Sequence, residues 1–309
     1  MNGVLIIDKA AGLTSHDVVN RVRRILNQRS VGHLGTLDPM ATGVLPLVIG
    51  SFTRLAQFYL MSEKMYEGTI RFGFATDTYD AEGEPTSAAS SVSVSREALD
   101  TVATRFRGVI AQTPPPFSAK KIKGIPAYKL ARKQKDVHLE PVQVEIKEFN
   151  ILSLDADRAR FCALVGSGTY MRSVAHDIGQ LIGCGAHLES LRRTSVAEFT
   201  VAEAHTLEEL AAAAGKRGVC EADGTGRPDS SLEPFETLFV HPRKLLPALP
   251  SVTADEMATA HIRSGRTVNL PELSRARQVK VFAGQRDMIA VANRIAGTLF
   301  HPKIVLCGS

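Results

Sequence analysis

The sequence predicts an α+β protein of two domains, the second of which is a small β-barrel. Its 309 residues are enough for about two domains. Apolar strand-like runs and amphipathic helical segments both occur in the first part, whereas only short strand signals joined by tight turns occur after about residue 239. We therefore expect one domain over residues 1–238 and a barrel over residues 239–309.

The composition is that of a globular chain with a modest excess of positive charge. Hydrophobic residues make up 44% and charged residues 22%, which excludes a disordered or collagen-like chain. The net charge is +5, and residues 239–309 hold ten basic residues against four acidic ones. The whole surplus therefore lies in the predicted barrel, which favours an anionic partner such as nucleic acid.

The chain offers little for metals, nucleotide cofactors or membranes. The four cysteines contain no C-x-x-C pair, so reduced thiols are expected rather than a zinc knuckle or a disulfide framework. Neither G-x-G-x-x-G nor a P-loop motif is present. No apolar run reaches 18 residues. We expect a cytoplasmic protein that spans no membrane and needs no metal or cofactor.

The first domain is expected to open with a buried strand and a capped helix. Residues 4–7 form an apolar run, and Thr14 or Ser15 can cap a helix that ends near Asn27. The remaining segments follow in chain order. Helices are expected over 53–60, 96–106, 172–182 and from Thr206 onward, a linker or long loop over 215–231, and strands over 44–49, 65–74, 141–149, 160–165, 267–270, 278–282, 288–292 and 299–306.

The most unusual stretch runs from Gly32 to Gly43 and reads GHLGTLDPMATG. An aspartate between glycines and a proline, such as Asp38, is commonly a turn former. The alternative is a carboxylate exposed at a strand edge, which can act as a covalent nucleophile when an adjacent cation keeps it ionised. Both interpretations stay open from spacing alone.

A second motif, GSGTYMR, runs from Gly166 to Arg172. At the start of a helix, Arg172 could pair with a carboxylate as a buried bidentate donor, or it could simply begin a surface helix. Tyr66 at a strand start and Leu191 in the segment 188–193 are, taken singly, ordinary packing residues.

A basic run covers residues 117–135. It contains seven lysines and arginines and no acidic residue, together with Phe117 and Tyr128. A solvated charged surface usually carries both signs, so this composition favours contact with nucleic-acid phosphates.

Together these motifs resemble the tRNA pseudouridine synthase B family, from Gly3 to about Ala204. The resemblance rests on residues 3–9, 32–43, 73–80, 115–121, 166–172 and 184–194, in the family's order, and on Tyr66. The last 71 residues resemble, less sharply, the PUA domain, a small RNA-binding barrel. The resemblance implies a mixed-sheet pseudouridine synthase core with flanking helices, a PUA-like barrel, and isomerisation of the uridine at position 55 in the tRNA T-arm.

The family's functional residues match single positions of this chain. Asp38 matches the nucleophile, which attacks either ribose C1′ or uracil C6, and Arg172 matches its cationic partner. Tyr66 matches the residue that stacks on uracil and is a candidate base for the C5 proton. Leu191 matches an apolar pocket wall, and His33 matches a residue that fills the gap left by flipped bases.

The same resemblance predicts the pocket lining and the RNA contacts. Gly35, Thr36 and Tyr170 are expected in the pocket. The side chains expected to contact RNA are Lys9, Lys120, Lys121, Lys123, Lys129 and Arg132. No cofactor, no obligate protein partner and a monomer are expected. The departures from the family pattern are Ala10, Ser167 and Gln134, which concern loop geometry and phosphate contact rather than Asp38, Tyr66 or Arg172.

Two other interpretations remain. The chain could be a non-catalytic tRNA-binding or folding module, which would give no product but would show salt-sensitive tRNA binding. It could also be the catalytic subunit of a guide-RNA-directed complex, although the predicted barrel is small for that role and no lysine-rich tail is present.

Overall fold

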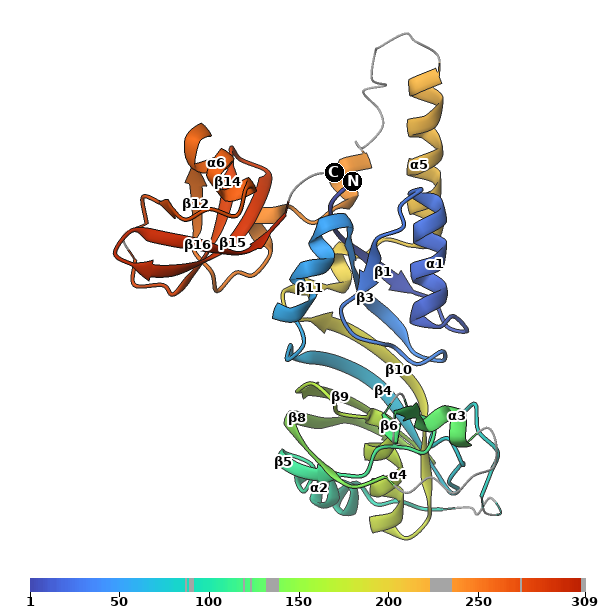
Figure 1. Ribbon diagram of the computed structural model, residues 1–309. Coiled ribbons are helices and arrows are strands. Elements are labelled where there is room, and N and C mark those ends of the chain that lie inside the picture. Colours follow the sequence, from blue (N-terminus) through green and yellow to red (C-terminus); the bar gives the residue numbers. More distant parts are fainter. Residues whose placement is uncertain are drawn as a thin grey trace.

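The computed structural model describes residues 1–86, 88, 92–118, 120–122, 124–131, 139–222, 235–272 and 274–306. A large mixed sheet with flanking helices forms the main body, and a smaller curled sheet lies beside it (Figure 1). This architecture confirms the predicted α+β class and the mixed-sheet core.

The large sheet follows the order β1-β3-β10-β4-β9-β8-β5, with β2 paired to β3 and β11 paired to β10. Within it the β3–β10 pair is parallel, and the other pairs are antiparallel. The strands are β1 (Gly3–Lys9), β2 (Val31–His33), β3 (Thr42–Ile49), β4 (Lys64–Phe72), β5 (Gly108–Gln112), β8 (Val142–Asp155), β9 (Arg158–Val165), β10 (Ala186–Val196) and β11 (Phe199–Thr200).

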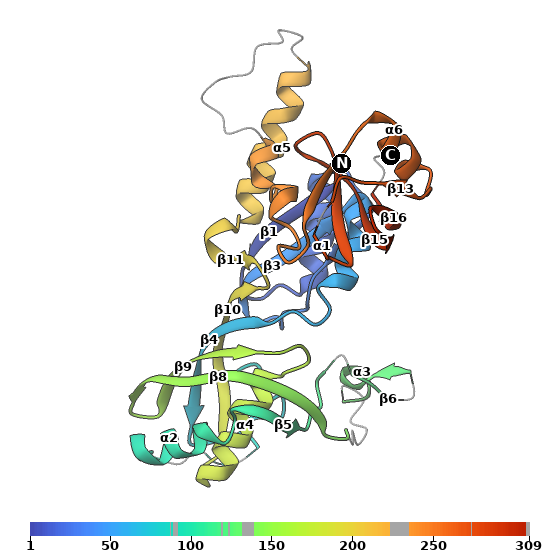
Figure 2. The same cartoon turned by 90° about the vertical axis from the view of Figure 1, so that its left-hand side faces the viewer.

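Helices flank this sheet at both ends. Helices α1 and α5 pack together beside β1 and β3, whereas α2 and α4 lie beside β8, β5 and β10 (Figures 1 and 2). Their bounds are α1 (Ser15–Ile25), α2 (Arg96–Thr104), α4 (Met171–Ile182) and α5 (Leu207–Ala222). The shorter elements are η1 (Gly50–Phe58), β6 (Lys121–Ile122), β7 (Ile125–Pro126), α3 (Ala127–Ala131), η2 (Val201–Glu203), η3 (Phe235–Leu238) and η4 (Pro242–Lys244).

Helix α1 begins where the sequence predicts. The Thr14 hydroxyl accepts a hydrogen bond from Asp17 N at 3.1 Å, and the Asp17 carboxylate accepts one from Thr14 N at 3.0 Å. This reciprocal arrangement satisfies two backbone donors at the helix start. Ser95 caps α2 by accepting from Ala98 N, and Thr206 with Glu209 forms the predicted capping box of α5.

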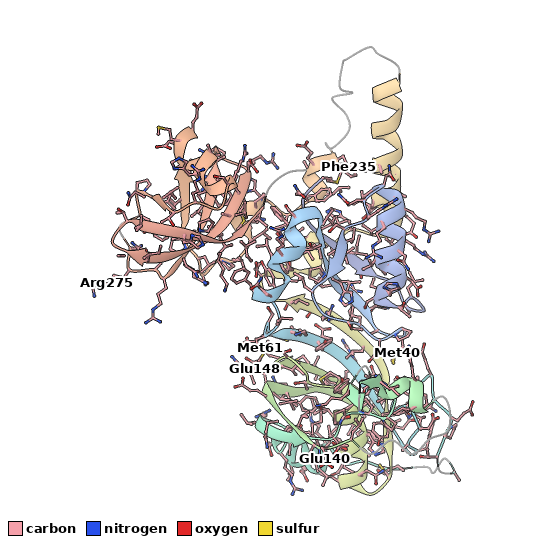
Figure 3. All side chains as sticks on the ribbon, viewed as in Figure 1. Met40, Met61, Glu140, Glu148, Phe235 and Arg275 are labelled. Atoms are coloured by element: carbon pink, nitrogen blue, oxygen red, sulfur yellow. The ribbon has the colours of Figure 1, made fainter. Side chains whose placement is uncertain are left out.

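Strand β1 is buried on both faces, which explains its uninterrupted apolar sequence. Leu5 and Ile7 belong to the core beneath α1, whereas Val4 and Ile6 belong to a second core on the opposite face. This alternation follows from the two-residue period of a strand. The second core also contains side chains of the C-terminal sheet, including Phe282 and Met288. Figure 3 shows the side chains of both sheets on the ribbon. The two sheets therefore share one hydrophobic core.

The C-terminal sheet is a curled half-barrel of five strands in the order β12-β14-β15-β16-β13, with α6 (Glu256–Arg263) packed against it. Its strands are β12 (Ser251–Ala254), β13 (Val268–Asn269), β14 (Gln278–Ala283), β15 (Asp287–Ala296) and β16 (Leu299–Val305). The predicted tight turns occur at Gly284 and Gly297, which have φ values of 68° and 50°. Such values favour glycine, since a Cβ is strained there.

Some elements differ from the sequence expectation. The loop predicted over 215–231 is wrong at its start, because α5 continues to Ala222, and residues 223–234 lie outside the described part. The sequence also did not predict β2, β5, β10, β12 or α6. The most consequential omission is β10, which lies in the middle of the large sheet.

Candidate active site

A bidentate ion pair joins Asp38, in the loop between β2 and β3, to Arg172 at the start of α4. Arg172 Nε lies 2.9 Å from Asp38 Oδ2, and Nη2 lies 3.0 Å from Oδ1. The Arg172 side chain is only 5% exposed, whereas that of Asp38 is 34% exposed. The cation therefore lies behind the carboxylate, and the carboxylate opens toward the solvent side.

The protein fixes the orientation of Arg172 through further acceptors. Its guanidinium donates to the carbonyls of Thr78 at 3.1 Å and Phe117 at 3.0 Å, and it lies 3.5 Å from a carboxylate oxygen of Asp80. Asp80 is itself buried and accepts a hydrogen bond from the Thr78 hydroxyl at 2.6 Å. Because these acceptors surround the guanidinium fork, Arg172 presents one defined edge to Asp38.

Three buried side chains fix the loop that carries Asp38. The Ser15 hydroxyl accepts from Leu37 N at 2.8 Å and donates to Leu37 O at 3.1 Å. Lys9 donates to Pro39 O at 3.0 Å. Arg193 donates to Gly35 O at 3.0 Å, and also to the carbonyls of Thr36 and Val44. The carboxylate is thus presented by a backbone that is held on both sides.

Lys9 does not have the position expected of an RNA-contacting residue. It has 0% exposure, and its ammonium donates to the carbonyls of Ala10, Leu13 and Pro39. With all three hydrogens used, no donor remains for a phosphate. Burial lowers the pKa of Lys9 to about 8, against the opposing effect of the nearby Asp38 carboxylate. The predicted RNA contact of Lys9 is therefore wrong, and its role here is to hold the loop.

Asp38 opens into a cavity of about 330 Å³, a volume within the range of small-molecule sites. Eight residues predicted for catalysis or for the pocket line this one cavity. They are His33, Gly35, Thr36, Asp38, Tyr66, Tyr170, Arg172 and Leu191. Asp38 also begins a backbone turn, since its carbonyl accepts from Ala41 N at 3.1 Å. The turn-forming and site-forming interpretations are therefore compatible.

Tyr66 and Leu191 come from neighbouring strands in the middle of the large sheet. Tyr66 in β4 is 7% exposed and pairs with Arg193 of β10, while Leu191 in β10 is 8% exposed and pairs with Gly68 of β4. Within the described residues the Tyr66 hydroxyl has no hydrogen-bond partner. An aromatic ring and an aliphatic side chain thus form apolar walls close to a charged pair.

Tyr170, just before α4, and His33, at the end of β2, complete the lining. The side chain of Gln112 holds the Tyr170 backbone by accepting from Tyr170 N at 2.8 Å and donating to Tyr170 O at 3.1 Å. Burial raises the pKa of Tyr170, and burial together with the Arg193 charge lowers the pKa of His33. Both side chains therefore favour their neutral forms in the cavity.

The sequence did not single out Arg193, Ser15, Gln112 or Lys64, all of which shape this site. Arg193 carried the clearest available signal, because a charged residue in a strand that is otherwise well buried must find polar partners. Its partners are carbonyl groups far away in the sequence. Neither the strand nor its partners could be identified from spacing.

The basic run is only partly described. Lys120 and Lys129 are exposed, as a phosphate-contacting surface requires. Lys123 and Arg132 lie outside the described residues, as does the side chain of Lys121.

No group of three or more histidine, cysteine, aspartate or glutamate side chains in the described part is arranged to hold a metal ion. Cys162 and Cys184 are free thiols. Across the described ranges, every helix is too short or too polar to cross a bilayer.

Comparison with known proteins gives matches along the whole chain. A family model described as "TruB family pseudouridylate synthase (N terminal domain)" matches residues 23–171, and one described as "tRNA pseudouridylate synthase B C-terminal domain" matches residues 172–240. A protein of Solibacter usitatus (strain Ellin6076) named "tRNA pseudouridine synthase B" is 48% identical over 309 residues, covering 99% of this chain and 100% of the relative. A protein of the same name from Aquifex aeolicus (strain VF5) is 37% identical over 308 residues, with 99% and 100% covered.

A solved structure has the same fold at low sequence identity. A chain in the "Crystal Structure of a Cbf5-Nop10-Gar1 Complex" gives a TM-score of 0.70 at 24% identity, covering 99% of this chain and 85% of that chain. This likeness concerns the fold alone. The family models and the full-length relatives carry the assignment of family: the chain belongs to the TruB family of pseudouridylate synthases and is an isomerase.

Proposed function

We propose that the chain converts the uridine at position 55 of the tRNA T-arm into pseudouridine, with Asp38 as the nucleophile acting on a flipped-out base. The observation that carries this proposal is the Asp38 carboxylate, held by Arg172 at 2.9 and 3.0 Å, at a cavity walled by Tyr66 and Leu191. The names of the full-length relatives support tRNA as the substrate.

The reaction exchanges one glycosidic bond for another. The bond between C1′ and N1 breaks, the uracil turns within the cavity, and C5 forms a bond to C1′. N1 takes up a proton and C5 loses one, so the product is an isomer of the substrate. Asp38 supplies the attacking carboxylate, and the two hydrogen bonds from Arg172 fix its orientation. The apolar walls hold the detached base while it turns.

Tyr66 is the candidate acceptor of the C5 proton, because its hydroxyl has no hydrogen-bond partner among the described residues and its ring lines the cavity. We expect Tyr66→Phe to bind RNA as the wild type does, because the ring remains, and to slow the chemical step by about 100-fold or more. Single-turnover rates measure the chemical step. Tyr79→Phe is the matched control, since Tyr79 stacks on His176 outside the cavity lining. Unchanged turnover in Tyr66→Phe would exclude the hydroxyl as the proton acceptor.

Extrusion of a base from a folded RNA loop costs a few kcal/mol. We expect phosphate contacts to offset this cost on two surfaces. One is the basic run, with Lys120 and Lys129 exposed. The other is the half-barrel, taken as a PUA-like domain over residues 239–309, from which Arg275 extends outward (Figure 3). The protein would then act on tRNA in the cytoplasm as a monomer, without an obligate protein partner.

The test is to incubate the purified chain with an unmodified tRNA transcript and no additive, and to map pseudouridine by chemical modification and primer extension. We expect one new pseudouridine, at position 55. A transcript with cytidine at that position should remain unmodified. Salt-sensitive binding without any product would favour the non-catalytic module, and activity only after a partner protein is added would favour a subunit of a larger complex.

A further inference from the structure

Lys64 lines the same cavity as the Asp38–Arg172 pair but has no part in the proposed chemistry. It lies at the start of β4, two residues before Tyr66, so the two side chains share one face of the strand. A Cβ atom added to Gly35 would lie 3.4 Å from Lys64 Cε. The stem of Lys64 therefore passes directly beside the loop that leads to Asp38.

The Lys64 ammonium has hydrogen-bond donors that the described part of the protein does not use. Within the described residues its ammonium donates one hydrogen bond, to Ser62 O at 2.7 Å, which leaves two of its three hydrogens. No carboxylate in the described part of the chain forms an ion pair with it. The carboxylate of its neighbour Glu63 pairs with Lys147 instead. Burial and the positive charge of Arg193 lower the pKa of Lys64 to about 8, as expected of a cation that lacks an anion.

The other cations at the cavity and behind the loop that carries Asp38 already have their hydrogen-bond acceptors. Arg172 is committed to Asp38 and to the carbonyls of Thr78 and Phe117. Arg193 donates to the carbonyls of Gly35, Thr36 and Val44, and Lys9 uses all three of its ammonium hydrogens. In the described residues, Lys64 is thus the cavity cation with donors to spare. A nucleotide that enters the cavity brings a negatively charged phosphate with it.

We propose that Lys64 binds a phosphate that flanks the flipped target nucleotide, and so positions the ribose against Asp38. This inference rests on the proposed function. Moving an ammonium from water to a position beside an apolar wall costs free energy, and a charge-assisted hydrogen bond to an anion offsets that cost. The phosphate contact would therefore be made only when the nucleotide has left the RNA stack, which couples binding energy to extrusion of the base.

The test combines one substitution with one neutralised phosphate. T-arm stem-loops carry a methylphosphonate, together with a 2′-O-methyl group, on one or the other flank of the target nucleotide. Reference RNAs carry the same 2′-O-methyl groups but ordinary phosphates. Wild type should lose about tenfold in kcat/KM when the contacted phosphate is neutralised, as for the loss of a hydrogen bond to a charged group. Lys64→Met should lose a similar factor on ordinary RNA and nothing more on that methylphosphonate RNA. Lys64→Arg should retain the sensitivity, and Lys147→Met should behave as wild type.

Equal penalties in wild type and Lys64→Met at both flanking phosphates would overturn the proposal. The readout does not depend on the stability of the variant, because each protein is compared with itself on two RNAs. Absence of product from wild type on ordinary RNA would instead contradict the proposed function and would be seen before any variant is tested.

Discussion

Asp38→Asn is expected to abolish pseudouridine formation while RNA binding stays within a few-fold of wild type. A carboxamide has nearly the shape of the carboxylate but is not a nucleophile, so we expect the single-turnover rate to fall by at least about 10⁴-fold. The fold should persist. Asp80 lies 3.5 Å from Arg172 and remains as a negative charge beside the guanidinium.

The measurement is the yield of pseudouridine in digested RNA, together with filter binding of the same RNA. Asp8→Asn is the matched control, because Asp8 forms a similar bidentate pair with Arg192, at 3.0 and 2.7 Å, and does not line the cavity. It should retain activity within a few-fold. Wild-type rates in Asp38→Asn would remove Asp38 as the nucleophile.

Arg172→Lys is expected to cost both stability and turnover, although it keeps the charge. A lysine cannot reach Asp38 with two parallel hydrogen bonds and also satisfy the carbonyls of Thr78 and Phe117. Since Arg172 is 5% exposed, a broken pair leaves buried carbonyl acceptors without a donor and the buried Asp80 without its cation. We expect a loss of about 3 kcal/mol in the free energy of unfolding and at least about a 100-fold fall in the single-turnover rate.

Urea unfolding and single-turnover kinetics separate these two effects. Arg192→Lys is the control, because it removes the same bidentate geometry at a side chain that is 41% exposed. Surface pairs of this kind contribute about 1 kcal/mol or less. If Arg172→Lys kept wild-type stability and rate, the guanidinium would not be what holds Asp38 in place.

Local features of the fold were predictable where the residue types involved have one common structural role, such as capping a helix or forming a turn. Thr14 caps α1, as its position in the sequence predicts, and Asp17 completes a capping box in the structure. The apolar run at residues 4–7 becomes β1, and the turn glycines Gly284 and Gly297 adopt positive φ values. Each of these signals depends on neighbours within a few residues, which a single sequence displays directly.

Strand β10 was not predictable in this way. Its sequence from Ala186 to Val196 mixes apolar residues with Glu189, Arg192 and Arg193, so it lacks a clear alternation. The charges are tolerated because each finds a distant partner, such as the loop carbonyls for Arg193 and Asp8 for Arg192. The pairing that makes this segment a central strand is therefore a property of the assembled sheet.

The candidate site likewise combines features that were predictable from the sequence with features that only the folded structure shows. The chemistry of Arg172 suggested a carboxylate as one of two possible uses, and the resemblance predicted that Asp38 is this partner and which other residues belong to the pocket. The resemblance led to the prediction that Lys9 contacts RNA, whereas three backbone carbonyls accept hydrogen bonds from its ammonium in the interior. Only the three-dimensional arrangement distinguishes these two uses of a lysine.

The most direct test of the proposed mechanism is a crystal structure of Asp38→Asn bound to an unreacted T-arm stem-loop. We expect the uridine at position 55 to be extruded into the cavity, with its base between Tyr66 and Leu191 and its C1′ atom facing the side chain of residue 38. A target uridine that remains stacked in its loop, or that lies away from residue 38, would contradict the assignment of this cavity as the place where the glycosidic bond is exchanged.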